Sequence, residues 1–329
     1  MKKVFGAMAV IALLCLCVAA HAVVMETVEV GNAGNTADTT GYGSVAYTYN
    51  IGKYEVTAGQ YTEFLNAKAK TDKYGLYNPF MASNTAGCQI QRTGGSGSYT
   101  YSIASDYANR PVNYVSYWDA CRFANWLGNG QGNGSTEAGA YTLNGYNWND
   151  GHGNTIQRNA NWKWAVTSED EWYKAAYYDP NKAGGAGYWD YPTSSNTTPG
   201  RDMADASGNN ANYYGNPYPI DSGKYTTVVG EFQNSDSPYG TFDQGGNIYE
   251  WNEAIRSEGS NYADRGLRGG SFYLPDDFLQ ASSYRYHYDT LSEFRHIGFR
   301  VSEVVPEPSS IIALAGGLVG LLGMRRRRA

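Results

Sequence analysis

The sequence has 329 residues, of which 42% are apolar and 17% are charged, and it contains 40 glycines and 30 tyrosines. An aromatic content of 15% excludes a disordered chain and favours one large or two small domains with many ordered loops. Six of the 25 basic residues lie in the terminal segments, at Lys2, Lys3 and Arg325–Arg328. The rest of the chain carries 19 basic against 31 acidic residues, which excludes nucleic-acid binding.

The N-terminal segment, residues 1–22, has the pattern of a signal peptide. Two lysines precede an apolar run from Val4 to Ala20, and small residues flank His21. We therefore expect cleavage after Ala22 and export of the remaining chain. A retained anchor helix is the alternative, but the apolar run is short for a membrane span.

Alternating apolar residues from Val45 to Ile51 predict a strand, and three short helices are predicted after it. Each helix begins with a capping box, in which Ser or Thr is followed three residues later by Gln, Asp or Glu: Thr57 with Gln60, Ser116 with Asp119, and Ser168 with Glu171. Gly128 is predicted to end the second helix, and Pro180 lies beyond the end of the third.

Two long stretches rich in Gly and Asn, 128–161 and 179–212, have little periodicity and are predicted to be surface loops. Short strands and turns are predicted after Asn212. Four tryptophans are predicted to be core residues rather than ligand platforms: Trp118, Trp126, Trp172 and Trp251.

Cys88 and Cys121 are the two cysteines that remain once a signal peptide is removed. In an oxidising compartment they could form one disulfide, but two cysteines are too few for a disulfide framework. A buried free thiol is the alternative for Cys121, because this residue lies in a predicted helix.

The C-terminal segment contains three parts in order: Pro306–Pro308, an apolar run from Ile311 to Met324, and the arginines Arg325–Arg328. Arginines resist crossing a bilayer, and the apolar run is short for a permanent span, so we expect a transient inner-membrane anchor. This order closely resembles the PEP-CTERM sorting signal, whose members are processed by an exosortase-type enzyme. A plain membrane tail is the alternative.

Six motifs in a fixed order resemble the formylglycine-generating enzyme (sulfatase-modifying factor) family: IGKYEVTAGQYTEFL, RPVNYVSYWDACRFANWL, TSEDEWYKAAYY, GGNIYEWNEA, RGGSF and IGFRV. The resemblance covers about Tyr47 to Val301. It implies an α+β, C-type-lectin-like fold that is rich in loops, with short helices and a small twisted sheet. We expect this domain to span residues 23–304, between the signal peptide and the sorting segment 305–329.

The resemblance also implies where chemistry would lie, because active members bind copper through paired cysteines after the GGS motif. Thiolates suit Cu(I), but the corresponding segment 268–289, RGGSFYLPDDFLQASSYRYHYD, has no cysteine. We therefore expect neither copper nor formylglycine generation by the known mechanism. The segment instead predicts a ligand-binding surface that includes Asp276, Asp277, Tyr284, Arg285, Tyr286 and His287.

Two structural calcium sites are implied by the family pattern, because carboxylates and carbonyl oxygens suit Ca²⁺. The first would use the side chains of Asp243 and Glu250 and the backbone oxygens of Gly246 and Ile248. The alternative is an acidic turn whose carboxylates accept backbone N–H groups. A second, weaker site would lie near Asn212, Tyr213, Asp221 and Gly223.

Three arginines match recurrent family positions and are expected to pair with Asp or Glu in the core: Arg268, Arg285 and Arg300. The resulting hypothesis is an exported, non-catalytic domain that binds a polysaccharide or a neighbouring surface protein. An extracellular matrix role overlaps with this hypothesis. The alternative from another class is a formylglycine-generating oxidase with an altered active site, and it rests on resemblance of the domain alone.

Overall fold

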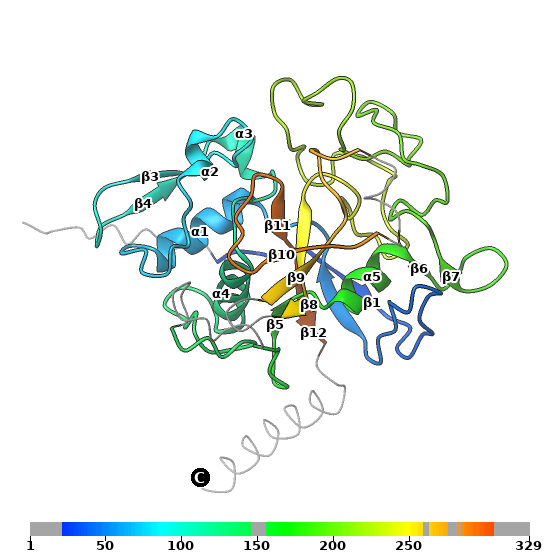
Figure 1. Cartoon of the computed structure of the whole chain (residues 1–329), viewed down its shortest axis with the longest axis horizontal. Coiled ribbons are helices and arrows are strands. Elements are labelled where there is room, and N and C mark those ends of the chain that lie inside the picture. Colours follow the sequence, from blue (N-terminus) through cyan, green and yellow to red (C-terminus); the bar gives the residue numbers. More distant parts are fainter. Residues whose placement is uncertain (1–21, 146–155, 259–262, 276–281, 283, 306–329) are drawn as a thin grey trace, which may run out of the picture.

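A computed structural model describes residues 22–145, 156–258, 263–275, 282 and 284–305 (Figure 1). Two four-stranded sheets lie at its centre, and short helices and long loops surround them. The first sheet has the order β1-β2-β12-β5, with strands Thr27–Val30, Tyr49–Gly52, Val301–Val304 and Trp164–Val166. The second has the order β10-β9-β8-β11, with strands Tyr286–Asp289, Ala263–Arg268, Tyr249–Glu258 and Ile297–Phe299.

Two small ribbons accompany the sheets, and they pair β3 with β4 and β6 with β7: Gln91–Thr93, Thr100–Ser102, Tyr178–Asp179 and Gly187–Tyr188. In the first sheet β12 is held on both edges, because Ser302 lies opposite Ile51 of β2 and opposite Ala165 of β5. In the second sheet β11 runs parallel to β8, whereas β9 runs antiparallel to both of its neighbours.

The predicted strand at residues 45–51 is shorter in the structure, where β2 begins at Tyr49. The residues before it form a loop because Asn35 provides their hydrogen bonds. Its side chain accepts from the N–H of Val45 and donates to the carbonyl oxygen of Gly43. The alternation of apolar side chains therefore begins at Val45, before the first residue of β2 that pairs with a neighbouring strand.

All three predicted capping boxes are present, at the starts of α1 (Ala58–Lys68), α4 (Tyr117–Gly128) and α5 (Glu169–Tyr177). At α5, Ser168 Oγ accepts from the N–H of Glu171 at 3.1 Å, and the Glu171 carboxylate accepts from the N–H of Ser168 at 2.8 Å. Two further helices are single turns, α2 (Phe80–Ser83) and α3 (Ser105–Ala108).

The main core forms where α1 and α4 meet the sheets. Phe64 packs against Phe123 and Trp126 with ring centroids 5.4 and 5.2 Å away, and Phe123 meets Phe299 of β11 at 5.4 Å. The four tryptophans predicted to be core residues are all buried. Burial of such aromatic side chains accounts for much of the hydrophobic stabilisation of a domain with little regular structure.

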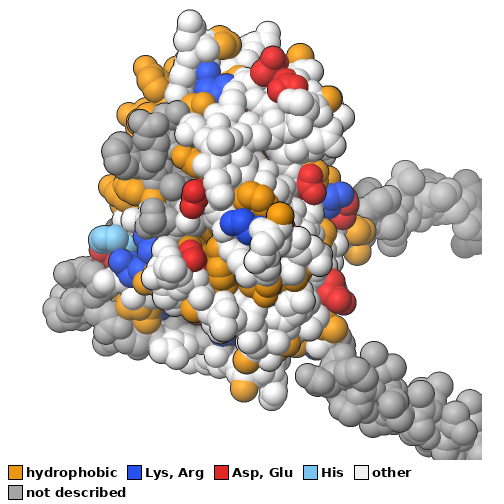
Figure 2. Space-filling view, turned by 90° about the vertical axis from the view of Figure 1, so that its right-hand side faces the viewer, with side chains coloured by type: hydrophobic (Ala, Val, Ile, Leu, Met, Phe, Trp, Pro, Cys, Tyr) orange, Lys and Arg blue, Asp and Glu red, His pale blue; other side chains and the backbone are white. Residues whose placement is uncertain are grey.

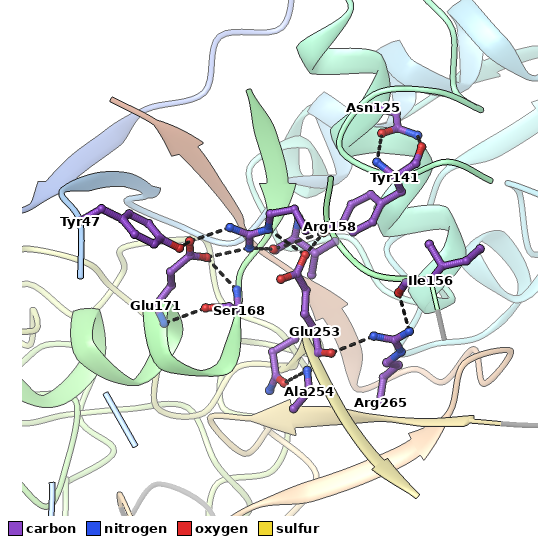
Figure 3. A network of polar contacts seen from close by, with 12 residues as sticks. Tyr47, Asn125, Tyr141, Ile156, Arg158, Ser168, Glu171, Glu253, Ala254 and Arg265 are labelled. Atoms are coloured by element: carbon purple, nitrogen blue, oxygen red, sulfur yellow. Dashed lines mark hydrogen bonds and ion pairs between the residues drawn. The ribbon is translucent and has the colours of Figure 1, made fainter. Parts of the chain in front are cut away.

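The stretch 128–161 was predicted to be a surface loop, and this prediction is wrong in part. Tyr141 is fully buried, and Arg158 enters a buried network shown in Figure 3. Arg158 pairs with Glu171 at 2.7 Å and with Glu253 at 2.9 Å. Low periodicity therefore indicated the lack of helix and strand here but did not indicate exposure.

The two ends of the described chain are both attached to the fold. The N–H of Val23 donates to Gln131 Oε1 at 2.6 Å, and Gln131 Nε2 donates to the carbonyl oxygen of Val23 at 2.8 Å. No helix among the described residues is long and apolar enough to cross a membrane. The predicted signal peptide, apart from Ala22, and the apolar run 311–324 lie outside the described residues.

Candidate functional site

The segment 268–289 leaves the second sheet at the end of β9 and returns to it as β10. After Arg268, Gly269 and Gly270 have φ values of 94° and 75°, in the left-handed region that favours glycine. A Cβ on Gly269 would lie 2.8 Å from the carbonyl oxygen of Gln244, so any larger residue would collide with the backbone. Ser271 and Phe272 after this turn are buried, and Tyr273 is the first residue that reaches the surface.

Six aromatic side chains around this segment contact one another, and we call them the aromatic surface: Tyr249, Tyr273, Tyr286, Tyr288, Phe294 and His296. Tyr286 stacks on Tyr249 with ring centroids 5.8 Å apart. Three of the six are exposed, with exposed fractions of 42% for Tyr273, 36% for Tyr286 and 40% for Phe294. Contiguous exposed aromatic rings are typical of a binding site rather than of an inert surface.

His296 lies at the centre of this group. Its ring stacks between those of Tyr273 and Phe294, at centroid distances of 5.5 and 5.7 Å. Burial, reinforced by the positive charge of Arg295, lowers the pKa of His296 to about 4. The imidazole is therefore neutral at neutral pH.

A strained loop holds the backbone beneath Phe294. Tyr114 has a φ of 57°, which costs about 1–3 kcal/mol for a residue that is not glycine. Its N–H donates to the carbonyl oxygen of Phe294 at 3.1 Å, and Asn113 Nδ2 donates to that of Arg295 at 2.6 Å. The strain at Tyr114 thus accompanies contacts that fix the position of the aromatic surface.

A pocket of about 780 Å³, which we call the acid-lined pocket, adjoins Phe294. Its lining includes the aromatic rings of Tyr74 and Trp118 and the carboxyl groups of Asp72, Asp119 and Glu293. Burial, reinforced by the charge of Asp119, raises the pKa of Glu293 to about 8. Burial likewise raises the pKa of Asp119 to about 6. At neutral pH Glu293 is therefore mostly protonated and can donate a hydrogen bond as well as accept one.

On the face shown in Figure 2, uncharged groups cover most of the surface, and hydrophobic side chains lie among them. This agrees with the low charged fraction of the sequence. Contacts to uncharged polar and apolar groups, rather than long-range electrostatic attraction, would therefore dominate binding on such a surface.

The four predicted ligand-binding residues of segment 284–287 have different surroundings. Tyr286 belongs to the aromatic surface, whereas the guanidinium of Arg285 pairs with Glu169 and donates to the hydroxyl of Tyr42. His287 Nδ1 lies 2.8 Å from a carboxylate oxygen of Asp264. Tyr284 is half-buried and packs against the main core. Asp276 and Asp277 lie outside the described residues.

The three family arginines pair with carboxylates, as expected. Arg268 and Arg285 share Glu169, and Arg268 Nη2 lies 2.9 Å from its Oε1. Arg300 pairs with Glu250 through two bonds of 2.6 Å. Arg285 therefore contributes to the framework below the surface, although the sequence also placed it in the ligand-binding group.

Both cysteines are buried free thiols, so the structure corrects the possible disulfide between Cys88 and Cys121. Burial raises the pKa of Cys88 to about 11 and raises the pKa of Cys121 further. Cys121 lies in α4, where a bond to Cys88 would compete with core packing. Both sulfurs are therefore protonated thiols at neutral pH.

The first predicted calcium site lies in a cluster of buried carboxylates that the sequence revealed only in part. Asp243 accepts from the N–H of Gly230 at 2.6 Å, and both oxygens of Glu250 accept from Arg300. Burial raises the pKa of Asp243 to about 6. Glu55 is the residue that sequence reasoning missed.

Glu55 provides the test of whether a cation fits this cluster. Its Oε1 accepts from Asn247 at 3.2 Å, but its buried Oε2 has no hydrogen-bond partner. Burial and the charges of Asp243 and Glu250 raise the pKa of Glu55. Within the described residues no three His, Cys, Asp or Glu side chains form a metal-binding group. A calcium ion would therefore rely on Glu55 and Asp243 with the backbone oxygens of Gly246 and Ile248.

At the second predicted calcium site, two of the expected oxygen ligands already accept from arginines. The Asp221 carboxylate pairs with Arg110, and the carbonyl oxygen of Tyr213 accepts from Arg201 at 2.8 Å. Asn212 Nδ2 donates to the carbonyl oxygen of Tyr225 at 2.9 Å. Gly223 has a φ of 90° and serves the turn between Asp221 and Lys224.

Comparison with known proteins agrees with this architecture. Residues 25–304 match the family model of the sulfatase-modifying factor enzyme 1-like domain, and residues 304–328 match the PEP-CTERM protein-sorting motif. The structure of CarF has a TM-score of 0.54 and 20% identity, covering 86% of this chain and 99% of CarF. Treponema denticola variable protein 1 has a TM-score of 0.50 and 17% identity, covering 84% and 94%. No curated protein sequence matches the chain.

The predicted fold class, α+β and rich in loops with short helices and small sheets, is confirmed by these similarities and by the observed elements. At these levels of identity the solved structures show the fold alone.

Proposed function

The chain belongs to the sulfatase-modifying factor enzyme 1-like family and carries a PEP-CTERM sorting motif, and on that premise we propose that it is an exported, non-catalytic binding module. The observation that carries the proposal is the aromatic surface beside segment 268–289. In segment 268–289, where the resemblance implies copper-binding thiols in active relatives, this chain presents the exposed rings of Tyr273 and Tyr286, and the exposed ring of Phe294 belongs to the same surface. The ligand would be a polysaccharide or a neighbouring surface protein.

Aromatic rings beside hydrogen-bonding groups favour such polar ligands. A ring offers an apolar face to carbon-bound hydrogens, while nearby hydroxyl and carboxyl groups fix orientation. The acid-lined pocket continues the surface beyond Phe294 and adds the carboxyl group of Glu293. Together they give an elongated ligand two adjacent places to bind.

A binding measurement on the exported protein tests this proposal. Envelope polysaccharides and envelope proteins, immobilised separately, would be titrated with the wild type and with the double variant Tyr286→Ala/Phe294→Ala. We expect the double variant to bind at least about tenfold more weakly, because truncating central aromatic contacts typically costs more than 1 kcal/mol each. Val24→Ala, which changes an exposed apolar residue at the N-terminus, is the control. Equal binding by all three proteins would contradict the proposal.

The alternative function, a formylglycine-generating oxidase with an altered site, lacks a supporting observation among the described residues. Cys88 and Cys121 are buried with raised pKa values and lie apart from segment 268–289 in the sequence. Incubation with copper and a cysteine-containing sulfatase peptide, followed by mass spectrometry, tests this alternative. Formation of formylglycine would replace the binding proposal with an enzymatic one.

The sorting motif implies processing by an exosortase-type enzyme and supports export to the cell envelope. We propose further that the mature chain spans Val23 to Val305, after transient anchoring in the inner membrane by the apolar run. The hydrogen bonds between Val23 and Gln131 support this N-terminus, because they attach the expected first residue of the mature chain to the fold. An intact-mass measurement of the exported protein would reveal both ends directly.

Calcium is proposed at Glu55 and Asp243, supported by the unpartnered oxygen of Glu55. A ligand that binds only the folded state raises the melting temperature, so calcium should stabilise the wild type. Glu55→Gln should abolish that effect, whereas Glu63→Gln on α1 should leave it unchanged. A melting temperature that is insensitive to both calcium and EDTA would rule out the site.

A further inference from the structure

Two polar atoms within the aromatic surface have no hydrogen-bond partner, although both are buried: the hydroxyl oxygen of Tyr249 and Nδ1 of His296. Nearly all buried polar atoms in native proteins are hydrogen-bonded, so each exception calls for a specific explanation. The rings of these two residues lie 6.1 Å apart between centroids, which places two exceptions side by side. None of the surrounding tyrosine hydroxyls bonds to either atom in this structure.

The groups that cover these atoms are the exposed rings of the same surface. Tyr286 stacks on Tyr249 at 5.8 Å with an angle of 17° between the rings. Tyr273 and Phe294 flank His296 at 5.5 and 5.7 Å. Rotation of an exposed side chain is fast and needs no backbone change, so a ligand that displaces these exposed rings would reach both polar atoms.

We propose that Tyr249 and His296 are the polar anchors of a site for an uncharged saccharide, whose hydroxyl groups bond to them while its ring packs against Tyr286, Tyr273 or Phe294. This inference rests on the proposed binding function and names its ligand class. A sugar hydroxyl both donates and accepts, so it can satisfy a phenol and either tautomer of an imidazole. A peptide is the competing ligand class, and the test below distinguishes it.

The charges around the two anchors agree with an uncharged ligand. Burial and the neighbouring tyrosines raise the pKa of Tyr249, and burial with Arg295 lowers that of His296, so both anchors are neutral at neutral pH. The nearby charged groups are Arg295, which lies over the Tyr273 ring at 4.3 Å, and the pair of His287 with Asp264. A saccharide would therefore bind with little dependence on ionic strength.

The unpartnered state of the anchors gives an unusual expectation for their variants. Tyr249→Phe and His296→Phe remove the polar atom but keep an aromatic ring, and neither breaks a hydrogen bond of the free protein. The melting temperature should therefore stay the same or rise, whereas saccharide affinity should fall by at least about fivefold, since an unmade bond to a neutral partner typically costs about 1 kcal/mol. Tyr49→Phe is the matched control, because the Tyr49 hydroxyl donates to the carbonyl oxygen of Glu171 at 2.5 Å. That variant should lower the melting temperature and leave affinity unchanged.

The experiment uses the exported protein and titrates cellohexaose, chitohexaose and mannohexaose by calorimetry, with thermal melts of every variant. Binding of one of these oligosaccharides, weakened by both anchor variants without loss of stability, supports the inference. Wild-type affinity in Tyr249→Phe and His296→Phe, or a drop of several degrees in their melting temperatures, overturns it. If the wild type binds none of the three but binds envelope protein through Tyr286 and Phe294, the binding function stands and the saccharide inference is wrong.

Discussion

The buried arginines and the aromatic surface treat polar groups in opposite ways. Arg300 donates to Glu250 through two bonds of 2.6 Å and to the carbonyl oxygen of Gly52 at 2.9 Å. In the aromatic surface, by contrast, Tyr249 and His296 each keep a buried polar atom without a partner. Arg300 therefore serves the folded chain itself, whereas the aromatic surface is completed by something from outside.

The largest expected effect is the loss of unfolding free energy caused by Arg300→Met in the buried arginine framework. The substitution would leave Glu250 buried without its cation, close to Glu55 and Asp243. Removing one member of a buried ion pair typically costs about 3–5 kcal/mol of unfolding free energy. Chemical denaturation should show this loss, with Arg92→Met at a partly exposed ion pair as the control. A loss below about 1 kcal/mol would mean that the buried arginines are not a framework.

The acid-lined pocket adds a pH dependence to the free energy of unfolding. Folding raises the pKa of Glu293 to about 8, so the folded protein holds a proton that the unfolded chain releases near pH 4.5. The associated stabilisation is complete below about pH 4.5 and is lost as pH rises through about 8, and a shift of this size corresponds to at most about 5 kcal/mol.

Glu293→Gln should remove this dependence and make the variant more stable than the wild type at pH 8–9. Thermal melts from pH 5 to 9 would measure the contribution of Glu293 as the difference in melting temperature between variant and wild type. The difference is needed because Asp119 and Asp243 also titrate near pH 6 and affect both proteins. Parallel curves for variant and wild type would show that Glu293 has an ordinary pKa.

On the surface side, Tyr286→Ala should cost less than about 1 kcal/mol of unfolding free energy, because the ring is partly exposed already. Its effect on binding should be much larger. Comparing urea denaturation with ligand titration for this one variant would sharpen the contrast between a residue kept for stability and one kept for binding. A destabilisation of 3 kcal/mol would place Tyr286 with the core.

The smallest effect is expected at a surface ion pair. Lys53 lies 2.8 Å from Glu26, but the Glu26 side chain is 61% exposed. Lys53→Met should change the unfolding free energy by less than about 0.5 kcal/mol, as exposed pairs usually do. The same denaturation measurement in low and high salt would detect any larger contribution as a loss on adding salt.

The sequence predicted the parts of the fold that depend on residues close together in the chain. A capping box joins residues three apart, so Ser168 and Glu171 could be read directly. Arg268 was expected to pair with an acid, but its partner Glu169 lies 99 residues away and could not be named. Glu55 was missed for the same reason, because only the fold brings it near Asp243.

The sequence predicted where the candidate site lies but not which residues form it. The missing cysteines and the tyrosines of segment 268–289 indicated a binding surface. Phe294 and His296 join that surface from the loop before β11, and Tyr249 joins it from β8, so no local pattern connects them. The pairing of Arg285 with Glu169 was equally hidden, because a charged residue between two tyrosines reads as exposed.

The position of β12 has a mechanical consequence. Its last residue, Val304, directly precedes the segment that would hold the protein at the membrane, so drag on the domain acts along this strand. Because β12 is bonded to β2 on one edge and to β5 on the other, such a pull shears two ladders of hydrogen bonds at once instead of peeling one. A membrane tether attached there would pull on a strand that is hydrogen-bonded along both of its edges.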